Sequence, residues 1–432
     1  MALVALTIFL ATYLALAIGG LPGFRMDRTG VAIIGAVLMV VSGVLPMPQA
    51  IAAIDYNTLI LLYGMMLIAG NLRLAGFFRL IAARALARAH RPLTLLFAVT
   101  VAAGMLSALF VNDVVCLVLT PLVITVTNQL DLNPRPYLLA LAAASNVGSV
   151  ATITGNPQNM LIGSLSGLSY VTFLEHMAPV AVLGLGITFA VVALLYRDDL
   201  RAGTLDSPPI GRARVHRPLL WKAGLVTAGV FLAFLLGLPV GLVSICGGAA
   251  LLITRRVKPA KIYAAVDWNL LVLFIGLFIV VEGAERTGLT TEAFRAAGHF
   301  NLQRPTVLTG LVAILSNLFS NVPAVLLFRS LVPTLPHPDA GWFTIAMAST
   351  LAGNLTLLGS VANLIVVEQA RASRIEITFA EHARVGVPLT LITLGLGIAL
   401  LRLTSPQGTG VIGHGATISV RNENGELLFS HP

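Results

Sequence analysis

Charged residues are scarce in this chain. Only 10% of its 432 residues are Asp, Glu, Lys or Arg, whereas a soluble domain usually carries about 25%. Mean hydropathy is +0.91, and apolar runs near 20 residues, long enough to cross a bilayer, recur along the sequence. The sequence therefore predicts an all-α, polytopic membrane protein that is embedded in the lipid bilayer.

Cysteine and nucleotide-binding motifs are nearly absent as well. The two cysteines, Cys116 and Cys246, lie within apolar runs, so neither a disulfide framework nor a Cys/His metal site is expected. No GxxxxGK phosphate loop is present, so the chain itself should not hydrolyse ATP. We expect no cofactor, and any pumping must draw on an ion gradient or on a separate ATPase subunit. The eight histidines fall in loops, span ends or the tail, which argues against a central histidine proton relay.

The positive charge that is present is unevenly distributed. A net charge of +9 would suggest nucleic acid as the partner of a soluble protein. Here the basic residues cluster in loops between apolar runs, as the positive-inside rule describes, so no nucleic acid is expected. The pattern predicts a multi-pass protein of the plasma (inner) membrane with both termini outside the cytoplasm. The outer loop 287–304, with Arg295 and Arg304, is the exception to this pattern.

The sequence repeats itself once, in order. Three motifs occur twice. Asp55-Tyr56-Asn57 matches Asp267-Trp268-Asn269, and Phe110-Val111-Asn112 matches Phe319-Ser320-Asn321. Gly155 through Asn159 matches Gly359 through Asn363. Ordered self-similarity of this kind indicates two related halves. We therefore divide the chain into a first repeat (1–196), a cytoplasmic linker (197–218), a second repeat (219–403) and a polar C-terminal tail (404–432) without an assigned role.

Each half is predicted to contain five spans plus a re-entrant hairpin. The spans are expected at about 3–22, 30–48, 57–78, 137–166 and 171–196, and at about 219–236, 239–254, 268–286, 342–371 and 384–403; the hairpins are expected at about 92–128 and 305–335. An odd number of crossings forces the second half to enter the membrane upside down. Two inverted repeats with broken helices are typical of alternating-access transporters.

One span in each half should be interrupted. Pro157 lacks an amide donor and clashes with the preceding turn, so a continuous helix should fail there. In lipid, such a break is tolerated only where protein or water surrounds it. We expect the neighbouring polar groups to form a mid-membrane substrate site: Asn146, Ser149, Thr152, Thr154, Asn156, Gln158 and Asn159, with Asn354, Thr356, Ser360 and Asn363 from the second break, which lacks the proline. The alternative is a kinked helix whose polar groups bond each other.

Asp113 is the carboxylate placed most centrally within an apolar run. A lone carboxylate in low dielectric should bind a proton or cation, or pair with a base; the alternative is a cap on the following helix. In the second hairpin, Ser320 and Asn321 occupy the tip but Val322 replaces the acid. One titratable tip suits a carrier coupled to about one proton or monovalent cation, so we assign proton coupling to Asp113, beside Asn112.

The stretches FVNDVVCLVLTP, SNVGSVATITGNPQNMLIG, FSNVPAVLL and STLAGNLTLLGSVANLIVVE resemble signatures of the ion transporter superfamily. Within it, residues 1–403 look most like ArsB/NhaD-type permeases, which include bacterial arsenite efflux permeases and plant silicon-efflux transporters. The resemblance implies a scaffold plus a mobile unit of hairpins and broken spans, often assembled as a homodimer. It places the site among Asn112, Asp113, Ser320, Asn321 and the two breaks. The GNPQN wording is closer to the silicon-efflux branch than to arsenite permeases.

The chemistry of these residues limits the classes of substrate that the site can bind. No Arg or Lys lies at either break, and Asp113 would repel an anion. Neutral hydroxylated solutes need the alternating donors and acceptors that are present. We therefore expect proton-coupled export of an uncharged metalloid hydroxide, either arsenite or antimonite, or silicic acid. The alternatives are a sodium/proton antiporter, a cation-coupled organic or inorganic anion transporter, and a passive channel. No enzymatic activity is expected, because an intramembrane protease would need a second mid-span aspartate or a buried histidine.

Overall fold

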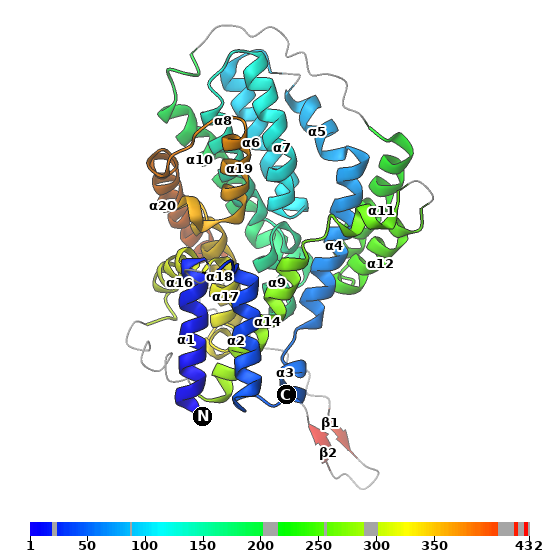
Figure 1. The fold of residues 1–432 in the computed structure, drawn as a ribbon, viewed down its shortest axis with the longest axis vertical. Coiled ribbons are helices and arrows are strands. Elements are labelled where there is room, and N and C mark those ends of the chain that lie inside the picture. Colours follow the sequence, from blue (N-terminus) through cyan, green and yellow to red (C-terminus); the bar gives the residue numbers. More distant parts are fainter. Residues whose placement is uncertain are drawn as a thin grey trace.

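The computed structural model describes residues 1–19, 24–86, 89–201, 215–254, 257–288, 301–404, 419–421 and 427–430. Within these ranges the chain is almost entirely helical, and most helices run along one long axis (Figure 1). Of the described helices, 7 are long and apolar enough to cross a membrane. The predicted all-α membrane fold is confirmed. In the tail, β1 (Ser419–Arg421) and β2 (Leu427–Ser430) form a small antiparallel pair.

The first half follows the predicted order of spans closely. Its helices are α1 (Ala2–Ile18), α2 (Arg28–Val41), α3 (Met47–Ala52), α4 (Tyr56–Ala75), α5 (Phe77–Leu86), α6 (Pro92–Leu109), α7 (Asn112–Gln129), α8 (Arg135–Ser149), the 3-10 turn η1 (Ile153–Gly155), α9 (Pro157–Ser166) and α10 (Tyr170–Leu195). The short helix α5 was not predicted. It is separated from α4 by Gly76, whose φ of 82° ends that helix in the left-handed conformation that glycine adopts most easily.

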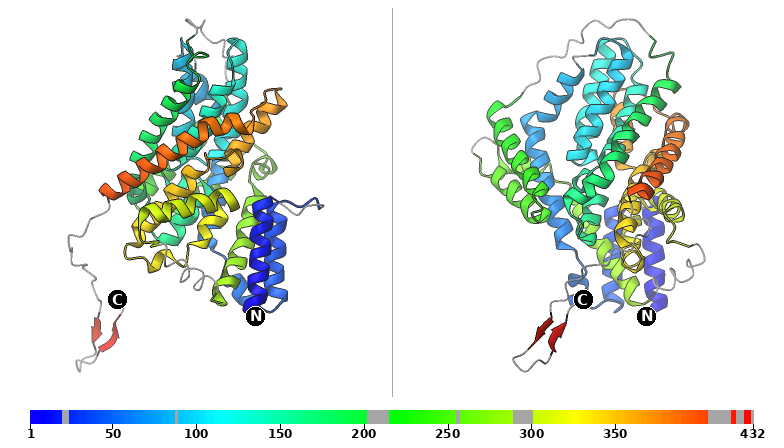
Figure 2. Two further views of the ribbon diagram at one scale, coloured as in Figure 1. Left: turned by 90° about the vertical axis from the view of Figure 1, so that its left-hand side faces the viewer. Right: turned by 180° about the vertical axis from the view of Figure 1, so that it is seen from behind.

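The second half has a similar order of elements, with an additional 3-10 turn and, among the described residues, no counterpart of α5. They are α11 (Arg217–Leu235), α12 (Val240–Leu252), α13 (Pro259–Tyr263), α14 (Trp268–Arg286), α16 (Pro305–Phe319), α17 (Asn321–Leu327), η3 (Val332–Thr334), α18 (Pro338–Ala352), η4 (Leu357–Gly359), α19 (Val361–Ala372) and α20 (Phe379–Thr404). Both predicted interruptions are present, one between α8 and α9 and one between α18 and α19. The two interrupted segments run in opposite directions along the long axis (Figures 1 and 2).

The repeated Asp motifs have a local structural explanation. Asp55 accepts a hydrogen bond from the backbone nitrogen of Asn57 at 3.0 Å and begins α4. Asp267 accepts one from the backbone nitrogen of Leu270 at 3.0 Å and begins α14. Both carboxylates therefore act as N-caps, a role that suits Asp, and the motif marks the start of the third span in each half.

Glycine allows the closest helix contacts. A Cβ atom built on Gly148 of α8 would lie 2.2 Å from the carbonyl oxygen of Gly104 on α6, and one on Gly64 of α4 would lie 2.5 Å from the carbonyl carbon of Ser244 on α12. Backbones that meet this closely gain dispersion contacts over a large area, which is how membrane helices associate without a hydrophobic driving force. The contact at Gly148 holds the broken segment α8 against α6, the first arm of the first hairpin, and the contact at Gly64 holds α4 against α12.

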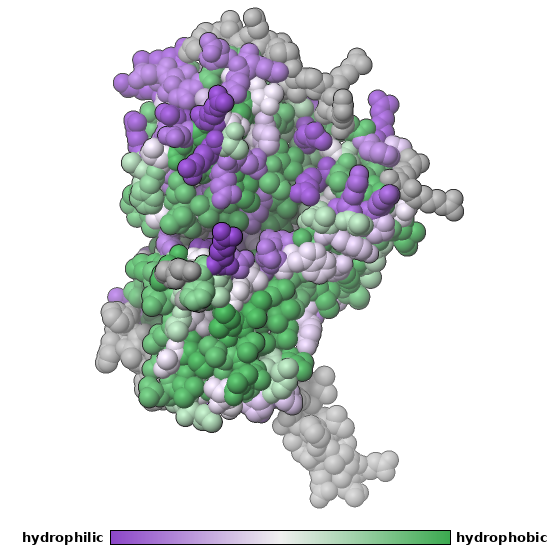
Figure 3. Space-filling view, viewed as in Figure 1, coloured by the Kyte–Doolittle hydropathy of each residue, from purple (hydrophilic) through white to green (hydrophobic). Residues whose placement is uncertain are grey.

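Surface polarity follows the long axis. Hydrophilic side chains gather over the upper half of the molecule in Figure 3, whereas the lower part, over α1 and α2, is mainly hydrophobic. A further hydrophilic patch lies in the hollow between these two regions. The orientation of each half in a bilayer, and the domain boundaries derived from the repeat, remain predictions.

Candidate functional site

The first break is held open by its own asparagines. The side-chain nitrogen of Asn159 donates to the carbonyl oxygens of Ser149 (3.1 Å) and Thr152 (3.0 Å). The backbone nitrogen of Asn159 in turn donates to Oδ1 of Asn156 at 2.8 Å, which makes Asn156 the N-cap of α9. Both asparagines are fully buried. They satisfy backbone groups that lose their helical partners where α8 ends, as a buried break requires.

The second break uses the same bonds at the matching positions. The side-chain nitrogen of Asn363 donates to the carbonyl oxygens of Gly353 (2.8 Å) and Thr356 (3.2 Å). Ser360 Oγ accepts from the backbone nitrogen of Ala362 at 3.2 Å and caps α19. These side chains stabilise the opened backbone, so the second segment can be interrupted without a proline.

Asn146 joins the two breaks and the first hairpin. Its Nδ2 donates to Oδ1 of Asn354 (2.8 Å) and to Oδ1 of Asn363 (3.1 Å). Its Oδ1 accepts from Nδ2 of Asn112 (3.0 Å) and from Oγ of Ser360 (2.9 Å). The structure therefore brings together five of the predicted site residues, which come from α7, α8 and both sides of the second break.

The predicted hydroxyl residues attach the breaks to their surroundings. Thr152 Oγ1 donates to the carbonyl oxygen of Ala108 in α6, and Thr356 Oγ1 donates to Oδ1 of Asn317 in α16 at 3.0 Å. Thr154 Oγ1 lies 3.2 Å from the hydroxyl of Tyr170 in α10. A further hydroxyl, Ser149 Oγ, donates to the carbonyl oxygen of Asn146 in its own helix. These side chains position the breaks against the hairpins and use their hydrogen-bonding capacity in doing so.

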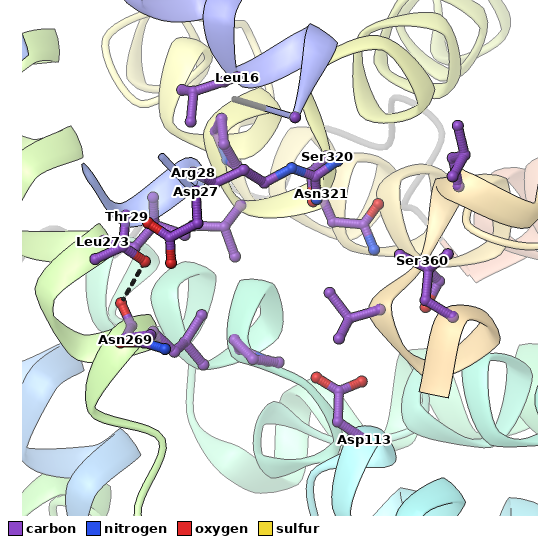
Figure 4. Close-up of a pocket in the computed structure, with 18 of the residues that line it drawn as sticks. Leu16, Asp27, Arg28, Thr29, Asp113, Asn269, Leu273, Ser320, Asn321 and Ser360 are labelled. Atoms are coloured by element: carbon purple, nitrogen blue, oxygen red, sulfur yellow. Dashed lines mark hydrogen bonds between the residues drawn. The ribbon is translucent and has the colours of Figure 1, made fainter. Parts of the chain in front are cut away.

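A cavity of about 690 Å³ lies beside this network and is shown in Figure 4. Its walls include the tips of both hairpins and the start of α9. The predicted site residues that line it are Asn112, Asp113, Gln158, Ser320, Asn321 and Ser360. The other predicted residues lie behind this wall, where they bond each other and the backbone. The site therefore has two layers. In the rear layer the polar groups bond one another and the backbone, as in the alternative interpretation, and in the front layer they line the cavity.

Asp113 faces the cavity from the first turn of α7. The N-cap position of α7 is Val111, and within the part of the chain that the structure describes Asp113 accepts no hydrogen bond from the helix backbone. Two amide oxygens of residues that line the cavity, Oδ1 of Asn112 and Oδ1 of Asn321, are buried without a hydrogen-bond partner among the described residues. A buried acceptor without a partner costs free energy. The wall is therefore suited to a ligand that brings hydrogen-bond donors.

The opposite wall comes from residues that the sequence analysis did not assign to the site. Asp27, Arg28 and Thr29 at the start of α2 line it, together with Asp267 and Asn269 at the start of α14. Thr29 Oγ1 donates to the carbonyl oxygen of Asn269 at 3.2 Å (Figure 4). The sequence offered two signals for this wall, namely the charged pair Asp27-Arg28 next to an apolar run and the repeated motif at Asp267. Neither indicates which cavity the side chains face.

His382 lies behind the second break. It sits in the first turn of α20, which begins at Phe379, earlier than the predicted start at 384. The ring is buried, and its Nε2 lies 3.1 Å from the carbonyl oxygen of Asn354. The residue is thus at a span end, as predicted, but the expectation that no histidine is buried was wrong, because its ring reaches the opened backbone and helps to satisfy it.

The sequence is similar to those of known transporters. The sequence model of the citrate transporter family (CitMHS) matches residues 13–352. A silicon efflux transporter, LSI3, from Oryza sativa subsp. japonica is 32% identical, covering 88% of this chain and 93% of the relative. The inner membrane protein YbiR of Escherichia coli is also 32% identical, covering 81% of this chain and 88% of the relative. A putative transporter, arsB, from Dictyostelium discoideum is 26% identical and covers 88% of each chain.

A solved structure has a related fold. The YdaH transporter of Alcanivorax borkumensis superimposes with a TM-score of 0.58, covering 93% of this chain and 97% of that one. Sequence identity between the two is 17%, so the likeness concerns the fold alone. The chain therefore shares the overall fold of this solved transporter.

Proposed function

The chain belongs to the citrate transporter family of the ion transporter superfamily, and from this premise we propose that it exports an uncharged metalloid hydroxide by proton-coupled alternating access. Members of this group are secondary transporters, which move a solute by means of an ion gradient. The proposed substrates are arsenite or antimonite in their neutral hydroxide form, or silicic acid. The names of the silicon efflux and arsB relatives support this class of solute.

The observation that carries the proposal is the excess of acceptors around Asp113. The unpartnered amide oxygens of Asn112 and Asn321 and the carboxylate of Asp113 all accept hydrogen bonds. A neutral hydroxide such as arsenous acid brings several O–H donors, which would satisfy these atoms. A polycarboxylate such as citrate brings mostly acceptors and a single hydroxyl donor, so it would leave most of these buried oxygens without partners.

The charge of the cavity supports the same conclusion. Four carboxylates line it, those of Asp27, Asp113, Asp267 and Glu368, against the single guanidinium of Arg28 among the described residues. A multiply charged anion would be repelled by this set of side chains, whereas a neutral solute carries no such penalty.

Asp113 is the proposed proton carrier. When ionised, its carboxylate accepts hydrogen bonds from the solute's hydroxyl groups. When protonated, it loses one acceptor site and its charge, so solute and proton compete for the same carboxyl group. Competition between two ligands for one site in each of two alternating states is the condition for exchange.

The proposal includes the membrane, the orientation and the partners of the transporter. We place it in the plasma membrane, with the basic loops in the cytoplasm and both termini outside. The proposed partners besides the solute are protons and the lipid bilayer, with a homodimer and a separate ATPase subunit as assemblies to be tested. Cross-linking in native membranes tests the homodimer. Loss of transport after ATP depletion, with the ion gradient maintained, tests the ATPase subunit.

Inside-out vesicles provide the test of function. With arsenous or silicic acid outside and an imposed gradient that is acidic inside, the wild type should accumulate the solute above its external concentration. Asp113→Asn should reduce gradient-driven uptake at least tenfold. Glu368→Gln is the matched control, because Glu368 lines the same cavity but is solvent-exposed. Full gradient-driven uptake by Asp113→Asn would exclude Asp113 as the coupling residue, and equilibration without accumulation would indicate a channel.

A second candidate is cation-coupled transport of an organic anion such as citrate. The match of residues 13–352 to the citrate transporter family favours it. Coupling cations would then have to offset the four cavity carboxylates. The same vesicles, supplied with citrate and either a sodium or a proton gradient, distinguish this candidate, and sodium-driven proton movement without any solute would indicate the antiporter alternative.

A further inference from the structure

Arg28 is a cation in the cavity wall that has no assigned partner. It is the first residue of α2 and is half-buried. Its guanidinium forms no ion pair or hydrogen bond with any residue that the structure describes, although carboxylates lie in the same cavity. A guanidinium is a strong fork-shaped donor that favours oxygen ligands. An unpaired one facing a polar cavity is therefore available to a ligand.

The neighbouring acids are already used by the backbone. Asp27 Oδ1 accepts from the backbone nitrogen of Gly30 at 2.9 Å and caps α2. Asp267 Oδ1 accepts from the backbone nitrogen of Leu270 and caps α14. These bonds hold both carboxylates at helix starts. In Figure 4, Arg28 instead reaches toward Ser320 and Asn321, at the tip of the second hairpin.

That tip has a strained backbone. Ser320 has φ 77° and ψ 160°, a conformation that is almost restricted to glycine and costs about 1–3 kcal/mol in other residues. The strained turn begins α17 and places Asn321 in the cavity wall, where its Oδ1 is buried without a partner. Across the cavity, Asn112 is 5% exposed and its Oδ1 also lacks a partner. Two unpartnered amide oxygens and one unpaired guanidinium thus line a single cavity.

We propose that Arg28 is a specificity-determining residue that binds an oxygen lone pair of the solute, while Asp113, Asn112 and Asn321 accept its hydroxyl protons. This inference rests on the proposed function and narrows the substrate class. The solute must carry O–H donors on one side and an oxygen that accepts a hydrogen bond on the other, as a small neutral oxyacid does. A bare alkali cation is disfavoured by Arg28, and a ligand with acceptors only is disfavoured by the amide oxygens.

The test compares Arg28→Gln with Arg25→Gln in the full-length protein purified in detergent. Arg25 is three residues away and exposed, and it does not line the cavity, so the two variants change the same charge. The probes are arsenous acid, silicic acid, citrate and sodium ion, and the readouts are equilibrium binding and ligand-induced thermal stabilisation. Arg28→Gln should weaken arsenous or silicic acid binding at least tenfold, Arg28→Lys should restore part of it, and Arg25→Gln should stay within twofold of wild type.

Chemical modification tests the role of Arg28 in the wild-type protein, so the result does not depend on whether a substituted protein folds. Phenylglyoxal should modify Arg28 in the wild type, and arsenous or silicic acid should slow the reaction at that residue by at least fivefold while leaving Arg25 unaffected. Mass spectrometry of peptides locates the modified residue. Equal rates with and without these probes would contradict the assignment.

The outcomes separate the two proposals. If the wild type binds only citrate, and Arg28→Gln loses that binding, the metalloid function is wrong and the role of Arg28 is retained. If oxyacid binding is the same in Arg28→Gln and wild type, the role of Arg28 is wrong and the proposed function stands. Binding of sodium alone, or of none of the four probes, overturns both.

Discussion

The side-chain nitrogen of Asn146 lies 3.1 Å from the side-chain oxygen of Asn363, and this hydrogen bond is one of several that connect the two broken segments. The same nitrogen donates to Asn354, and the side-chain oxygen of Asn146 accepts from Asn112 and Ser360. One amide therefore sets the distance between the breaks and the first hairpin. Any movement that alternates access to the cavity must either carry this group as a unit or break its bonds.

Replacing Asn146 by alanine should destabilise the protein by about 3 kcal/mol, because several buried polar groups would lose a partner at once. Unfolding by a denaturing detergent, followed by tryptophan fluorescence, measures the change. Asn71→Ala is the control, since the side-chain nitrogen of this buried asparagine bonds only to the carbonyl oxygen of Leu67 in its own helix. A loss below about 1 kcal/mol in Asn146→Ala would mean that the network contributes little to folding.

The ion pair of Arg329 with Glu285 should connect the second hairpin to α14. The guanidinium lies 2.5 Å from Glu285 and 2.5 Å from Glu282, and all three side chains are less than one quarter exposed. Arg329→Met should cost about 2–3 kcal/mol, because it leaves the partly buried carboxylate of Glu285 without its partner, whereas Glu282 keeps its ion pair with Arg286. Adding Glu285→Leu should recover part of this loss.

Thermal unfolding of these variants in detergent gives the comparison. Arg201→Gln, which removes an exposed pair with Asp198, should change stability by less than about 0.5 kcal/mol. If Arg329→Met is as stable as Arg201→Gln, the cluster is not a structural link between the hairpin and α14.

Gly148→Ala should disrupt the contact between α6 and α8. The added methyl group would lie 2.2 Å from the carbonyl oxygen of Gly104, so the backbones must separate, at a cost of about 3 kcal/mol. Gly186→Ala in α10 is the control, because nothing lies within 4 Å of the added atom, and alanine should be neutral or slightly stabilising there. Fluorescence-detected size exclusion after heating measures both. Equal melting temperatures would show that α6 and α8 are farther apart than described.

Ser320→Gly should stabilise the protein by about 1 kcal/mol, because glycine adopts φ 77° without strain. Ser320→Ala keeps the strain and should leave stability unchanged, which separates the backbone effect from loss of the hydroxyl group. Differential scanning calorimetry in detergent measures the two variants. A destabilised Ser320→Gly would indicate that the hydroxyl group contributes more to the turn than its backbone costs.

Much of the fold follows from the sequence because lipid imposes simple rules. Apolar length identifies the spans, and the break before Pro157 follows from the missing amide donor. The second break was found by its repeat mate, and the bonds of Asn159 and Asn363 explain why it needs no proline. The boundary at Gly76 was missed, because a left-handed glycine looks like any other glycine in an apolar run.

The division of the site into two layers was not available from the sequence. Asn156, Asn159 and Asn363 are as polar as Gln158 and Asn321, yet the first three bond the opened backbone and the last two line the cavity. Which direction a side chain takes depends on the neighbouring carbonyl groups, and these are placed by packing.

The sequence by itself determined that this chain crosses a membrane many times, that two of its helices are interrupted and that one carboxylate, Asp113, lies among apolar residues. Hydropathy, proline chemistry and self-similarity are local properties, so they can be read along the chain. Only the tertiary structure placed Arg28 in the same cavity as Asp113 and made Asn146 the joint between the halves. Those relationships connect residues far apart in sequence, and the packing of helices against one another decides them.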